Sequence, residues 1–164
     1  MDKVATNSDG TEPLGERLSL AFANTADWHA SDHPVEALTS YSELVAWGQQ
    51  AGALTESEAQ HLLEGATHRP AEASTVLERA VSLREAIWRL FSAISRGLSP
   101  EADDLVELNG ALSSTLAQSR LVQTADGFAL DWKAADDALD RMLWPVVRDA
   151  ADLLTSGALD RVGQ

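Results

Sequence analysis

Cysteine is absent from the sequence, and its absence excludes disulfide bonds and cysteine-ligated metals. Long apolar runs are absent too, because none approaches the roughly 18 residues of a membrane-spanning helix. Residues 1–13 also lack the apolar segment of a secretory signal. Together these absences predict a cytoplasmic protein that does not enter a membrane.

Positive charge is scarce in this chain. Lys3 and Lys133 are the only lysines, and 12 basic residues stand against 26 acidic ones, which gives a formal net charge of −14. Because nucleic-acid backbones are bound by clustered lysines and arginines, we expect no direct nucleic-acid binding by this chain. The sequence also lacks a nucleophile motif, a phosphate-binding glycine loop and a dinucleotide fingerprint, so it predicts no cofactor.

The length and composition fit one folded domain. The chain has 164 residues, of which 45% are hydrophobic, and this is enough for a substantial core. Residues 1–13 are polar and predict a flexible N-terminal tail, whereas residues 14–164 predict a single domain. No internal repeat or linker divides them.

Apolar residues recur every three or four positions through most of this domain, which is the spacing of one helix face. The pattern predicts a mainly α-helical bundle of about six helices, near residues 14–28, 41–51, 56–67, 74–96, 100–116 and 135–154. Residues 18–22 also alternate, so a strand is an open alternative there. Ser40 with Glu43, and Thr55 with Glu58, fit capping boxes at two helix starts.

A different pattern separates the fifth expected helix from the sixth. Two short alternating runs flank Asp126 and Gly127, and an Asp-Gly pair between such runs is typical of a tight turn. The sequence therefore predicts one small β-hairpin near residues 120–132. In the sixth helix, Pro145 removes a backbone donor, so we expect a bend in the helix axis.

Four segments resemble, in order and spacing, the ABATE family of bacterial transcription regulators. They are LSLAFANT at residues 18–25, LREAIWRLF at 83–91, LN at 108–109 and LWPVVRDAADLL at 143–154. The family opens with the pattern LxLDFxNT, and its closing helix carries the same arginine and an AAxLL ending. The resemblance covers residues 14–162 and implies a helical, ligand-sensing regulatory domain.

Two departures from the family pattern affect the expected function. Ala21 stands where the family carries Asp, and the cysteine-rich CGNR zinc finger that usually follows the domain is not found before Gln164. A trimmed chain and a gene without the finger are both open explanations. These residues alone, without zinc ligands, are expected to sense a small molecule but not to read DNA.

Arg84 is the first candidate for a ligand-binding residue, because it interrupts the apolar face of the helix expected at 74–96. An unpaired buried guanidinium costs several kcal/mol, and the Asp that the family carries at position 21 would be a natural partner for it. Arg84 could instead hold a small anionic metabolite through two hydrogen bonds. The structural alternative is that it pairs with Asp149 or Asp152, or reaches the surface.

Further residues could line the same pocket through amide, hydroxyl, indole and guanidinium groups. They are Asn24, Thr25, Trp28, Trp88, Trp144 and Arg148. Each has a structural alternative, since the amide and hydroxyl could satisfy the backbone at a helix end. The tryptophans could simply belong to the core.

His29 is a weak candidate for a general base, and Asp27 and Asp32 are weak candidates beside it, because a histidine titrates near neutral pH. His29 and His33 have the i, i+4 spacing of a helical zinc site. The following Pro34 disfavours helix at that point, so no metal site is predicted.

Three functions therefore remain open at the level of sequence. The first is a ligand-sensing domain of a transcription regulator, as the resemblance implies. The second is a stand-alone enzyme or carrier with cofactor-free acid–base or rearrangement chemistry in a pocket lined by tryptophan and arginine. The third is an interaction module that forms a homodimer through an apolar helical face.

Overall fold

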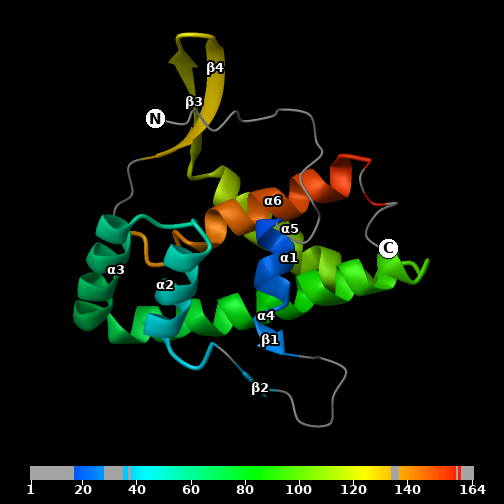
Figure 1. Cartoon of the computed structure of the whole chain (residues 1–164), viewed down its shortest axis with the longest axis horizontal. Coiled ribbons are helices and arrows are strands. Elements are labelled where there is room, and N and C mark those ends of the chain that lie inside the picture. The colour runs from blue at the N-terminus through cyan, green and yellow to red at the C-terminus, as the bar shows by residue number, and fades with distance from the viewer. Residues whose placement is uncertain (1–16, 28–34, 37, 134–136, 158, 160–164) are drawn as a thin grey trace, which may run out of the picture.

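Six helices make up most of the described part of the chain, which covers residues 17–27, 35–36, 38–133, 137–157 and 159 in a computed structural model (Figure 1). They are α1 (Leu18–Ala23), α2 (Tyr41–Gln50), α3 (Glu56–His68), α4 (Pro70–Ser95), α5 (Ala102–Leu116) and α6 (Leu143–Thr155). The prediction of a mainly α-helical fold is confirmed. Residues 1–13, the predicted tail, lie outside the described residues.

The longest helix, α4, organises the fold. It contacts α1, α2, α3 and α5, while α6 packs against α1 and α5. Figure 1 shows α4 extending along the helical body, with α2 and α3 beside its first half. None of the described helices is long and apolar enough to cross a membrane.

Local capping signals set two of the helix starts where the sequence predicts them. The Ser40 hydroxyl accepts a hydrogen bond from the Glu43 backbone N–H at 3.2 Å. The predicted capping box is only half formed there, because the Glu43 carboxylate accepts from the Thr39 backbone N–H at 2.7 Å and not from that of Ser40. Thr55 and Glu58 form a full capping box, with bonds of 3.1 and 3.2 Å that satisfy both backbone donors. α4 begins four residues earlier than expected because Pro70 occupies its first turn, where a missing N–H costs nothing.

The first and the last helix are both shorter than predicted. α1 begins at Leu18 and ends at Ala23, where Thr25 donates its hydroxyl to the Phe22 carbonyl and closes the helix end. α6 begins at Leu143, so Pro145 lies in its first turn instead of bending its middle. The prediction of a bend was wrong because the first backbone N–H groups of a helix have no acceptor to lose.

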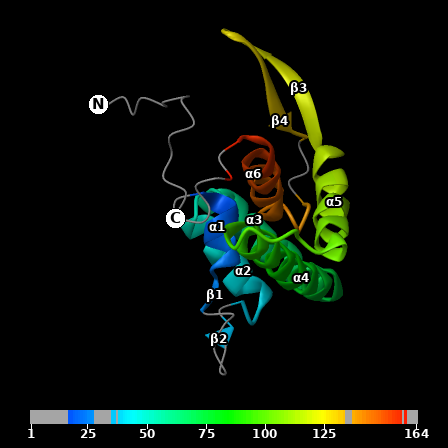
Figure 2. The ribbon, with the colours of Figure 1, turned by 90° about the vertical axis from the view of Figure 1, so that its right-hand side faces the viewer.

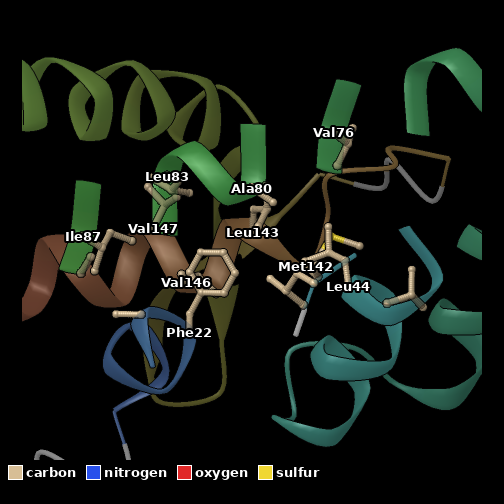
Figure 3. Close-up of a cluster of buried hydrophobic side chains, with 14 of the residues drawn as sticks. Phe22, Leu44, Val76, Ala80, Leu83, Ile87, Met142, Leu143, Val146 and Val147 are labelled. Carbon is tan, nitrogen blue, oxygen red and sulfur yellow. The ribbon is translucent and has the colours of Figure 1, made fainter. Parts of the chain in front are cut away.

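The hydrophobic core lies where α1, α4 and α6 meet and extends toward α2. Figure 3 shows Phe22 of α1 facing Val146 of α6, with Leu83 and Ile87 approaching from α4. The core side chains repeat at three- and four-residue spacing along α4 and α6, as the sequence pattern requires. α4 and α6 thereby become fixed walls for the surface beside them.

The predicted hairpin is confirmed as β3 (Ser119–Thr124) paired antiparallel with β4 (Gly127–Trp132). Figures 1 and 2 show it projecting from the helical body beyond the end of α5. Leu121 and Phe128 share one face of this ribbon and are 73% and 76% exposed. Two further short strands that the sequence analysis did not predict, β1 (Ala26–Asp27) and β2 (Val35–Glu36), pair antiparallel near α1.

Tyr41 ties the start of α2 to the segment that leads into α6. Its side chain is buried, and its hydroxyl donates a hydrogen bond of 2.7 Å to the Leu139 carbonyl. Burial, and to a smaller extent the nearby Asp140 carboxylate, raises the pKa of this phenol well above its usual 10.0. The neutral phenol is therefore part of the folded state.

We expect stability to fall as the pH rises beyond 10, because Tyr41 of the unfolded chain ionises near the ordinary pKa of 10.0 while the folded chain keeps its proton. Tyr41 is the only tyrosine, so ultraviolet difference absorbance of tyrosinate follows it alone. Tyr41→Phe removes this part of the alkaline loss and lowers stability at neutral pH by about 1 kcal/mol, since the Leu139 carbonyl loses its donor. Tyrosinate absorbance growing near pH 10 in a still-folded protein would contradict the burial.

Candidate ligand groove

A groove of about 500 Å³ lies between α4, α5 and α6, within the size range of small-molecule sites. Its lining comes from all three helices and from the turn before α6. The lining residues are Arg79, Leu83, Val106, Glu107, Gly110, Ala111, Ser114, Thr115, Asp140, Leu143, Trp144 and Val147. The groove is therefore shaped by the packing of distant segments and not by one local motif.

The floor of the groove is apolar. Leu83 of α4 and Leu143, Trp144 and Val147 of α6 are all buried. Figure 3 shows Leu83, Leu143 and Val147 together where α4 and α6 meet. Because α6 starts at Leu143, its first two turns bring Leu143, Trp144 and Val147 to the groove, with Val147 four and three residues after the other two.

Two buried residues of the lining, Thr115 and Trp144, each carry a side-chain polar group that no described residue bonds. Thr115 is 3% exposed and Trp144 is 2% exposed, yet neither the Thr115 hydroxyl nor the Trp144 indole N–H is bonded to a described residue. Neither atom is among the buried polar atoms without a partner in the described residues, so both remain within reach of solvent. These two groups are thus available to a molecule that enters the groove.

Gly110 keeps the α5 wall of the groove open. It lies inside the helix, and a Cβ atom added there would meet no heavy atom within 4 Å. Glycine in a helix interior costs about 0.5–1 kcal/mol relative to alanine. The position therefore gives up some helix stability while leaving room for close approach to the backbone.

Charge is uneven around the rim of the groove. Arg79 Nη2 lies 3.7 Å from Asp140 Oδ2, and the Arg79 side chain is 54% exposed, so this ion pair is long and well solvated. Glu107, on the opposite wall, has no hydrogen-bond or ion-pair partner within the part of the chain that the structure describes. The rim thus carries two carboxylates and one guanidinium.

Arg84 is buried on α4, as the sequence pattern indicates, with 1% exposure. Its Nη2 lies 2.8 Å from the Glu85 carboxylate, so it forms an ion pair with its neighbour in sequence and not with Asp149 or Asp152. Arg84 is not part of the groove lining. Its role in holding an anion stays a prediction.

Asp149 of α6 binds the start of α1 instead of Arg84. Its Oδ2 accepts hydrogen bonds from the Ser19 backbone N–H at 2.8 Å and from the Ser19 hydroxyl at 2.6 Å. Arg17 Nε lies 2.9 Å from Oδ1, in an ion pair whose direction is not that of a good hydrogen bond. The carboxylate thereby caps α1, whose own Arg17 provides no capping side chain.

The other predicted ligand residues fall in three places. Asn24 is exposed in the turn after α1, and Thr25 bonds the α1 carboxyl end. Trp88 is half-buried against the core. Trp144 lines the groove and lies 5.6 Å from Trp132 between ring centroids, whereas the guanidinium of Arg148 lies over the Trp132 ring at 5.8 Å. The structure thus brings Trp144 to the groove and joins Arg148 to it only through Trp132.

The candidate catalytic residues are only partly described. Asp27 lies in β1, while Trp28, His29 and Asp32 lie outside the described residues. No group of three histidine, aspartate or glutamate side chains close enough to hold a metal occurs among the residues that the structure describes. An acid–base role for His29 remains a prediction.

Sequence reasoning missed most of the groove, although α5 carries two signals for it. The buried face of α5 includes Asp104, Leu108 and Thr115 at four- and seven-residue intervals, so polar residues interrupt an apolar stripe. Gly110 stands inside the same helix, where a glycine needs a packing or functional reason. The convergence of α5 with Asp140 and Leu143 required the fold.

These features define a class of protein, namely a helical domain with an open groove between three of its helices. The profile of the ABATE family, described as "Putative stress-induced transcription regulator", matches residues 16–157. The chain therefore belongs to the ABATE family. No curated protein and no solved structure is significantly similar to it.

Proposed function

We propose that this ABATE domain is the small-molecule-sensing part of a transcription regulator, and that its ligand occupies the groove between α4, α5 and α6. The observation that carries the proposal is a groove of about 500 Å³ with an apolar floor, in which the Thr115 hydroxyl and the Trp144 indole N–H are bonded to no described residue. Apolar pockets with a few convergent polar groups are the usual form of small-molecule sites.

The position of the groove suits a sensor. A ligand that touches α4, α5 and α6 at once favours the arrangement of these helices in which all of its contacts are made, and so shifts the balance of their conformations. α6 also holds α1 through Asp149, and its Trp144 packs at a tilt against Trp132 of the hairpin. A change at the groove therefore has a physical route to two other parts of the domain. The net charge of −14 argues against DNA contact by these residues themselves.

Filling the groove tests this proposal. Gly110→Phe adds a ring where a Cβ meets nothing within 4 Å, so we expect the variant to fold but to lose ligand binding. Asn109→Phe is the matched control, because Asn109 is exposed on the same helix and does not line the groove. A saturation-transfer NMR screen of metabolites should give hits with the natural sequence and with Asn109→Phe, and the hits should disappear with Gly110→Phe. Hits that persist in Gly110→Phe would contradict the assignment of the site.

A further inference from the structure

We infer that the groove takes a ligand with a positively charged nitrogen on an apolar body. This inference rests on the proposed function, since it names the chemical class of the ligand for the same groove. It differs from the expectation of an anion, which depended on Arg84. Arg84 does not line the groove, and its side chain is already paired with Glu85.

The charges on the rim favour a cation. The Glu107 carboxylate is without a partner within the described ranges, and Asp140 is held by Arg79 only across 3.7 Å. An ammonium group in the groove would be attracted by both carboxylates and could donate a charge-assisted hydrogen bond to either one. Arg79 is exposed enough to move aside, because its contact with Asp140 is a surface ion pair of small net value.

The same charges would disfavour a ligand that carries a carboxylate group. Of the groove's lining within the described segments, Arg79 is the one basic side chain, and it faces two acidic ones. An anion placed there would have to compete with Asp140 for Arg79 and would lie near Glu107. The net charge of −14 adds repulsion at longer range and raises the local concentration of cations.

The floor of the groove favours an apolar body for the rest of the ligand. Leu83, Leu143 and Val147 form an apolar surface beneath the charged rim (Figure 3), which suits a hydrocarbon or aromatic body. The hydroxyl of Thr115, a buried residue of the lining, can accept a hydrogen bond as well as donate one. It therefore matches an ammonium group, whereas the Trp144 N–H can only donate.

Three probes with one body and different head groups test the preference. Phenethylamine carries a cation, phenethyl alcohol is neutral and hydrocinnamate carries an anion. We expect calorimetric titration of the full chain at neutral pH and low salt to show the amine binding about 10- to 100-fold more tightly than the alcohol. Hydrocinnamate should bind more weakly than the alcohol.

Glu107→Gln and Asp140→Asn remove the charges with little change of shape. Each should bring the amine closer to the alcohol in affinity, and leave the alcohol unchanged. Glu101→Gln is the matched control, because Glu101 is exposed just before α5 and does not line the groove. If all three probes bind equally and Gly110→Phe abolishes that binding, the groove remains a ligand site and only the charge preference is overturned. Failure of the amine to bind at all also overturns the inference, whereas the proposed function is then decided by the metabolite screen.

Discussion

Replacing Asp149 with alanine should lower the free energy of unfolding by about 2–4 kcal/mol, because one carboxylate satisfies several groups that cannot find other partners. Ser19 is fully buried, and both its backbone N–H and its hydroxyl donate to Asp149 Oδ2. Arg17 also loses the opposite charge at 2.9 Å. α1 has six residues, too few to form a stable helix by itself, so we expect it to detach first.

Asp152→Ala is the control for this prediction. Asp152 lies one turn further along α6 and is exposed, so its loss should change stability little. Chemical denaturation measures both variants, and hydrogen exchange at α1 should rise only in Asp149→Ala. The free energy of unfolding of Asp149→Asn should lie between those of the two alanine variants. Its amide oxygen still accepts a hydrogen bond from Ser19, but the neutral amide no longer offsets the charge of Arg17. Equal stabilities for Asp149→Ala and Asp152→Ala would mean that the carboxylate does not hold α1.

The helices that the sequence predicted well carry their own boundary signals. Thr55 and Glu58 bond each other's backbone N–H groups whatever the rest of the fold does, so the start of α3 is readable from four residues. Gly52 and Gly97 adopt positive φ just after α2 and α4, as a helix end of this type requires. These boundary signals are local. The three- and four-residue spacing of apolar residues further predicted which face of each helix would be buried.

Pro145 shows where the same reasoning fails. A proline within an apolar periodic stretch predicts a bend if the helix extends on both sides, but a proline in the first turn predicts nothing unusual. The choice depends on whether the residues before it are helical, and the described residues 137–142 form turns that pack Leu139 and Met142 into the core. Tertiary burial therefore decided the start of α6.

The candidate site was predicted only in part for a similar reason. Arg84 was singled out because it interrupts an apolar helix face, and Trp144 because its indole could line a pocket. Both are buried, but only Trp144 lines the groove. The other lining residues of the groove could not be deduced in this way, since Glu107 and Asp140 come to line one groove only when α5 packs beside α6. A sequence pattern shows which face of a helix is buried but not which other helix covers it.

The second large effect concerns Phe22, which joins α1 to the rest of the core. Its side chain is fully buried, its ring centroid lies 5.0 Å from that of Trp47, and it faces Val146 (Figure 3). Phe22→Ala should lower the free energy of unfolding by about 3–5 kcal/mol, the usual cost of deleting a buried ring and leaving a cavity. For a chain of this size, such a loss lowers the melting temperature by roughly 10 °C.

Phe128→Ala is the matched comparison, because it deletes the same ring from a side chain that is 76% exposed on the hairpin. It should leave the melting temperature nearly unchanged, since little buried area is lost. Differential scanning calorimetry of the two variants thus separates the contribution of burial to stability from that of the phenylalanine ring itself. If Phe22→Ala has the same melting temperature as Phe128→Ala, then α1 is not part of the cooperative core. In that case the contacts of α1 with α4 and α6 would contribute nothing to the walls of the groove.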